Sequence, residues 1–130
     1  MPANHHIDHK TKLIITRWEG IARDFELINA IKKYQEEIQN HPDYIHYNEV
    51  LDLTKVSSNQ VTVEGIRNIA QIASETDHSE SNRKLALIVD SSLSFGLARM
   101  YETYRKYGKS GHKKIRVFRD EKSALEWVQQ

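Results

Sequence analysis

The sequence predicts an α/β domain built on a mostly parallel sheet of about five strands, with an antiparallel hairpin strand at one edge and four helices. Apolar runs at 13–18, 50–53 and 85–89 alternate with stretches in which apolar residues recur at helical spacing. Strand–helix alternation implies parallel strands joined by right-handed crossovers. A chain of 130 residues fits one such unit, so we expect a single domain over 1–130, with 1–5 as a flexible terminus.

The N-terminal elements are a hairpin and a helix. Residues 6–9 form a weak strand that is expected to turn back onto the strand at 13–18. Between residues 22 and 40 the spacing predicts a helix, which Pro42 would prevent from continuing. The predicted inward face of this helix carries Phe25, Ile28, Ile31 and Ile38.

The middle of the chain holds the two strands that are most apolar. The strand at 50–53 is followed by an expected polar loop at 55–60 and then by a helix for which Thr62 is a suitable N-cap. The run at 85–89 is apolar throughout, as is typical of a central strand that is covered on both faces.

The C-terminal part repeats the alternation. A helix is expected over 95–107, with Gly108 as its C-cap. A strand at 115–118 follows, and Asp120 is placed to N-cap a final helix.

Four segments resemble one known family. Leu-Asp-Leu-Thr-Lys-Val at 51–56 and Val-Glu-Gly-Ile at 63–66 resemble the strand, turn and helix start of STAS domains (sulfate transporter and anti-sigma-factor antagonist), also called SpoIIAA-like. Phe-Gly-Leu-Ala-Arg-Met-Tyr-Glu at 95–102 and Val-Phe-Arg-Asp at 117–120 are similar to a bacterial SpoIIAA-like subgroup of largely uncharacterised proteins. The resemblance covers nearly the whole chain and implies the SpoIIAA-like fold and a regulatory or protein-interaction role.

One position departs from the regulatory members of that family. Those members carry an Asp-Ser-Ser-Gly motif, and phosphorylation of its first serine switches partner binding. When the motif is anchored on Gly65, the acceptor position falls on Val63, which has no hydroxyl. The resemblance therefore implies an interaction module without the phosphoserine switch, and Asp90-Ser91-Ser92 does not replace the motif because it follows a different strand.

The first functional hypothesis is thus a non-enzymatic regulatory module that contacts a protein partner through its second and third helices. Ligands of open α/β sheets bind outside the carboxyl ends of strands, which is where Asp90-Ser91-Ser92 is expected to lie. In the alternative reading of this segment, Ser92 or Ser94 caps the following helix. The candidate contact residues are Thr62, Glu64, Arg67, Asp90, Ser91, Ser92 and Arg99.

The second hypothesis is a carrier of a small apolar or lipid-like ligand. Trp18, Phe95, Met100 and Tyr101 are large side chains that could line an apolar pocket, although the same spacing is typical of an ordinary core. The segment Arg105–Arg116 holds six basic residues and no acid. This segment could contact an anionic membrane surface, or its charge could simply be favoured by the helix dipole.

Composition and motifs exclude other classes. A net charge of +1 disfavours a nucleic-acid binder, and no apolar run approaches the ~20 residues of a membrane span. The chain has no cysteine and lacks the known nucleophile and phosphate-loop motifs, so we expect a cytoplasmic non-enzyme without cofactor. The seven histidines, including His5 and His9, show no convincing metal spacing. A homodimer remains open.

Overall fold

The computed structural model describes residues 3–75, 83–107 and 113–130. The expected fold class is confirmed, because these residues form a mixed five-stranded sheet with four α-helices. Gly108, the expected C-cap of the third helix, lies outside the described residues. The elements are β1 (Ala3–Asp8), β2 (Leu13–Ala22), α1 (Asp24–Asn40), the 3-10 helix η1 (Pro42–His46), β3 (Asn48–Asn59), α2 (Val63–Ser74), β4 (Lys84–Ile88), α3 (Ser92–Lys106), β5 (Lys114–Phe118) and α4 (Glu121–Val128).

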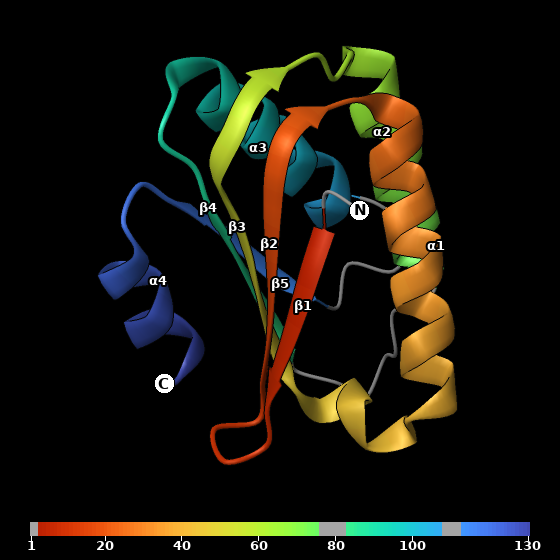
Figure 1. Cartoon of the computed structure of the whole chain (residues 1–130), viewed down its shortest axis with the longest axis vertical. Helices are drawn as coiled ribbons and strands as arrows, with labels where there is room; N and C mark the ends of the chain where they lie inside the picture. The colour runs from red at the N-terminus through yellow and green to blue at the C-terminus, as the bar shows by residue number, and fades with distance from the viewer. Residues whose placement is uncertain (1–2, 76–82, 108–112) are drawn as a thin grey trace.

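The strands of the sheet follow one another in chain order. β1 is antiparallel to β2, and β2 to β5 are parallel, so the order is β1-β2-β3-β4-β5. Because every crossover steps in the same direction and has the same hand, α1, α2 and α3 lie together on one face of the sheet. Helix α4 covers the other face (Figure 1).

The two faces are packed differently. Side chains alternate between the faces along each strand, so Leu13 and Val50 point toward α4, where they pack with its Ala124 and Val128. On the opposite face, Leu85, Leu87 and Val89 pack against Ala98 of α3. The α4 face is a closed core, whereas the face under α1, α2 and α3 is covered incompletely.

Helix α1 stands away from the sheet. It packs beside α2 and over η1 more closely than against any strand, and Ile38 is its one buried residue. The prediction that Phe25 faces inward is wrong, since its side chain is 61% exposed. Phe25 lies in the first turn of α1, beyond the part of the helix that approaches Ile14 and Tyr47.

Strand β3 is longer than the sequence predicts. The expected loop at 55–60 is wrong, because β3 continues to Asn59 and pairs with the second half of β2. Register shifts between Arg17 and Glu19 and between Gly20 and Ile21 keep the two strands paired beyond the apolar run. The first strand likewise begins at Ala3, earlier than expected.

The helix caps are mostly those that the sequence predicts. Thr62 and Asp120 are N-caps, whose side-chain oxygens accept hydrogen bonds from the backbone N–H of Gly65 and Ser123. For α3, the choice of Ser92 or Ser94 as the cap is wrong. The N-cap is Ser91, whose hydroxyl accepts the Ser94 N–H at 3.1 Å.

Candidate functional site

A cavity of about 180 Å³ lies between the sheet and helices α1, α2 and α3. It exists because α1 rests on α2 and leaves the middle of the sheet face open beneath it. Interiors normally contain few voids larger than a water molecule, so a space of this size is unusual in a small domain. Its apolar walls include Trp18, Leu27, Ile31, Leu53, Ile66 and Leu97.

Charged side chains gather at one end of this cavity. Glu49 is at the start of β3, and Arg83 and Lys113 immediately precede β4 and β5. Leu85 pairs with both Glu49 and Ile115 across the sheet. Arg83 and Lys113 each lie two residues before a member of that row, so all three charged side chains point to the cavity face.

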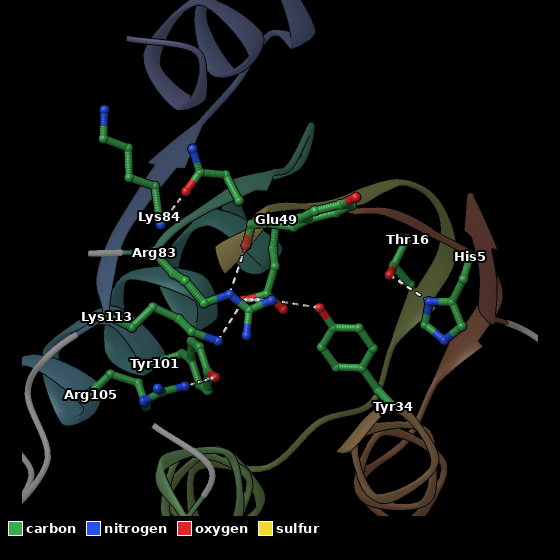
Figure 2. Close-up of polar contacts among 11 residues, drawn as sticks. His5, Thr16, Tyr34, Glu49, Arg83, Lys84, Tyr101, Arg105 and Lys113 are labelled. Carbon is green, nitrogen blue, oxygen red and sulfur yellow. Dashed lines mark hydrogen bonds and ion pairs between the residues drawn. The ribbon is translucent and has the colours of Figure 1, made fainter. Parts of the chain in front are cut away.

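The three charged groups form a buried ion-pair cluster (Figure 2). Lys113 Nζ lies 2.5 Å from Glu49 Oε1, and Arg83 Nη2 lies 3.3 Å from the same oxygen. Arg83 also donates from Nε to the Tyr47 carbonyl at 2.7 Å and from Nη2 to the Tyr34 hydroxyl at 3.1 Å. Tyr34 comes from α1, so the cluster ties this helix to the sheet at the end where the parallel strands begin.

Burial and the neighbouring charges have opposing effects on the pKa values of Glu49 and Lys113. Burial alone would raise the pKa of Glu49, but the charges of Lys113 and Arg83 outweigh it and lower that pKa to about 2. Burial lowers the pKa of Lys113, and the nearby Arg83 and Arg105 add to this effect, while Glu49 opposes it. Burial and the charge of Glu49 raise the pKa of Tyr34 well above its ordinary value.

A second polar pair completes this end of the cavity. Arg105 of α3 is 3% exposed and donates from Nη1 to the Tyr101 hydroxyl at 2.7 Å. Both residues line the cavity, as do Tyr34 and His5. His5 of β1 hydrogen-bonds through Nδ1 to Thr16 Oγ1 at 2.7 Å and stacks on Tyr34, with ring centroids 5.5 Å apart.

The candidate partner-contact residues all lie on the surface. They cluster around the N-termini of α2 and α3 and along the outer sides of these helices. Arg67 extends over the ring of Tyr104, and Arg99 pairs with Glu102 at 3.4 Å. The exposed set is Thr62, Glu64, Arg67, Asp90, Ser91, Ser92 and Arg99.

Among the described strands, the carboxyl ends do not form the topological switch point at which ligands of open α/β sheets usually bind. Such a point forms where the strand order reverses and neighbouring crossovers diverge to opposite faces. Here the order of the described strands never reverses. Asp90 and Ser92 are exposed, and the hydroxyl of Ser91 caps α3.

The candidate ligand-binding residues separate into two groups. Trp18 and Tyr101 line the cavity. Phe95 packs instead against the core beneath α3, with the Arg119 guanidinium 4.5 Å from its ring centroid. Met100 is half-buried on α3 and is not part of the cavity wall.

The basic segment Arg105–Arg116 does not present all its charge to solvent. Arg105 and Lys113 turn inward to the cavity, while Lys106, Lys114 and Arg116 are exposed. Lys109, the sixth basic residue of the segment, lies outside the described residues.

The described residues were also compared with the requirements of metal sites and of membrane-spanning helices. Within 3–75, 83–107 and 113–130, no group of three or more His, Asp or Glu side chains is arranged to hold a metal ion. In the same ranges, no helix is long and apolar enough to cross a membrane.

The charged cluster was missed by sequence reasoning, although a signal for it was present. Glu49, Arg83 and Lys113 each stand at or just before the start of an apolar strand run. Adjacent parallel strands begin at the same edge of a sheet, so charges at these positions become neighbours. Considered one at a time, such residues resemble ordinary solvent-facing charges at strand ends.

Comparisons with known proteins bear on the fold. No family model and no curated protein matches the chain. Among solved structures, it is similar to an uncharacterised protein of the DUF3478 family from Shewanella loihica PV-4, described as having a SpoIIAA-like fold. The two chains share 11% identity with a TM-score of 0.60, over 97% of this chain and 91% of the other. Together with the sheet and helices described above, this likeness shows that the chain has the SpoIIAA-like fold.

Proposed function

We propose that this protein is a non-enzymatic binding module that holds a small apolar, lipid-like ligand between its sheet and helices α1, α2 and α3. The observation that supports this function is the cavity of about 180 Å³. An engineered apolar cavity of about 150 Å³ is large enough to bind benzene. The space here is therefore sufficient for a small organic molecule.

The energetics of an empty cavity support the same proposal. Side chains that border an unfilled apolar space lack part of their packing contacts. A ligand that fills the space recovers the lost packing contacts. The apolar side chains of Trp18, Leu53 and Leu97 provide the surface for it.

Filling the cavity with a side chain tests the proposal. Ala73 of α2 lines the cavity, and Gln71 on the same helix is exposed. Ala73→Leu adds bulk toward the cavity, while Gln71→Leu adds the same side chain on the surface and is the matched control. The probe is octan-1-ol, and its binding is measured by isothermal titration calorimetry. We expect it to bind the wild type and Gln71→Leu with equal affinity, and to bind Ala73→Leu at least ~10-fold more weakly.

Two results would contradict the proposal. One is the absence of octan-1-ol binding to wild-type protein that was stripped of copurifying molecules. The other is equal binding to all three proteins, which would place the ligand elsewhere. Native mass spectrometry of the protein before stripping gives an independent reading, because a carried ligand adds a discrete mass.

A second candidate function is the docking of a protein partner at the edge where α1, α2 and α3 begin. Phe25, Val63 and Leu93 are 61%, 50% and 59% exposed, and each lies in the first turn of one of these helices. Asp24 links the starts of α1 and α2, since its carboxylate accepts hydrogen bonds from the Thr62 N–H and hydroxyl. Large apolar side chains gathered on a surface are typical of interaction sites.

Charge substitutions at this edge distinguish docking from ligand carriage. We expect a Val63→Glu, Leu93→Glu variant to lose a partner that copurifies with the wild type, and to keep octan-1-ol binding. Gln39→Glu, at the opposite end of α1, is the control and retains the partner. A partner that binds all three proteins equally would exclude this edge as its docking site.

A further inference from the structure

The cavity is apolar along most of its length and charged at one end, and a purely apolar ligand would leave the charged end without a partner. Its lining follows β3 from Glu49 to Asn59, a distance of roughly 30 Å at the usual rise of a strand. Near Leu51 and Leu53 the walls are apolar. At the Glu49 end they become charged, through Arg83, Arg105 and Lys113.

Among the described residues, most of the charged side chains that line this end of the cavity are cationic. Of the described residues that line the cavity, Arg83, Arg105 and Lys113 are cationic, and Glu49 is the one carboxylate. Arg83 and Lys113 both pair with the same oxygen of Glu49. Charge-assisted hydrogen bonds are strong in a water-poor interior, so these cationic groups would hold an anionic group of a ligand well.

Lys113 has the geometry to receive such an anion. An ammonium group has three N–H donors, and among the described residues the Lys113 ammonium contacts Glu49 alone. Burial and the two neighbouring guanidinium groups lower the pKa of Lys113. A second carboxylate or a phosphate beside it would act in the opposite direction and favour the charged ammonium.

We propose that the ligand is a single-chain amphiphile with an anionic head, a carboxylate or a phosphate, bound at Lys113, Arg83 and Arg105. The proposal rests on the ligand-binding function proposed above and specifies its chemistry. The hydrocarbon chain lies along β3 under α1 and α2, because the apolar part of the lining follows β3 away from the charged end. A cationic head is repelled at this end, and a neutral head gains no charge-assisted hydrogen bond.

Four eight-carbon probes test the proposal in wild-type protein by titration calorimetry at neutral pH: octanoate, octyl phosphate, octan-1-ol and octylammonium. We expect octanoate or octyl phosphate to bind at least ~10-fold tighter than octan-1-ol, since hydrogen bonds to charged groups are the stronger ones. Octylammonium should bind more weakly than octan-1-ol. Whichever anion binds more tightly identifies the head group.

Matched variants locate the head. Lys113→Met should bring octanoate and octyl phosphate to within ~3-fold of octan-1-ol and leave octan-1-ol itself unchanged. Lys114→Met, at the next residue, is exposed and should preserve the preference for anions. If Lys113→Met fails to fold, the comparison of the four probes in the wild type still tests whether the cavity prefers an anionic head group.

The outcomes separate the two proposals. If octan-1-ol binds the wild type as tightly as both anions do, the head-group proposal fails while ligand carriage stands. If the anions bind tightly but Lys113→Met keeps the full preference, the head lies elsewhere and the assignment to this cluster is wrong. If none of the four probes binds, both proposals fail.

Discussion

Replacing Glu49 by glutamine removes one charge from the buried cluster and keeps the shape of the side chain. Glu49 is 6% exposed and is the carboxylate that pairs with both Lys113 and Arg83. In Glu49→Gln, the two cations remain buried without this partner. Removing one member of a buried ion pair is strongly destabilising because the remaining charge is left uncompensated.

The pKa of Glu49 gives the size of the effect. A carboxyl group with an ordinary pKa of 4.5 titrates at about 2 in the folded protein. A difference of this size corresponds to about 3 kcal/mol of stability at neutral pH. With a urea dependence of about 2 kcal/mol per molar, Glu49→Gln should lower the urea midpoint by about 1.5 M.

The pH dependence of the stability loss in Glu49→Gln shows whether the negative charge of Glu49 is its cause. The folded-state pKa of Glu49 is depressed, so its contribution is complete above pH 4.5 and is lost as the pH falls toward 2. The difference between wild type and Glu49→Gln should therefore shrink to less than half by pH ~3. Glu126→Gln, on the exposed side of α4, is the control and should change stability by less than ~0.5 kcal/mol.

Urea unfolding followed by far-ultraviolet circular dichroism measures these differences at pH 7, 4.5 and 3. The reasoning is refuted if Glu49→Gln costs less than ~1 kcal/mol at pH 7. It is also refuted if the cost is the same at pH 3 as at pH 7, because a loss of packing alone would not depend on the ionisation of Glu49.

Three further substitutions test the fold around the site, each measured by denaturant unfolding. Gly65→Ala should destabilise by about 1–3 kcal/mol, because a Cβ there would overlap the Asp24 carboxyl group. The double variant Gly65→Ala, Asp24→Ala should cost less than the sum of the two single substitutions. Asp120→Ala should cost about 1 kcal/mol through loss of the N-cap of α4, and this cost should fall at acid pH, where the carboxyl that accepts the Ser123 N–H is protonated. Ala73→Leu should leave stability unchanged or raise it, since it fills the cavity; a loss of more than ~2 kcal/mol would mean that the space is already filled.

The fold was predictable from the sequence because its signals are local. The apolar run at 85–89 and the capping residues Thr62 and Asp120 each report on a few neighbouring positions, and the structure confirms them. The extension of β3 to Asn59 was missed because residues such as Ser58 and Asn59 are not typical of a strand. What keeps them in the sheet is pairing with β2, which is a long-range contact.

The cavity and its charged end were not predictable in this way. The spacing of Ile28, Ile31 and Ile38 predicts an apolar helix face. The packing of α1 on α2 determines that Ile31 borders a cavity, whereas Ile38 packs against Ile14 of β2. Similarly, the sequence shows Glu49 and Arg83 as charged residues that are far apart. Their pairing depends on which strands are neighbours.

The agreement between strand order and chain order has a consequence for how the molecule assembles. Each strand pairs with the one that precedes it in the chain, so the sheet can grow by adding one strand–helix unit at a time during synthesis. Pairings that are close in sequence incur little loop-closure entropy and favour rapid folding. The exception is the charged cluster, since Lys113 joins Glu49 only when β5 is added. Chains truncated before β5 should therefore collapse but lack the ion pair between Glu49 and Lys113.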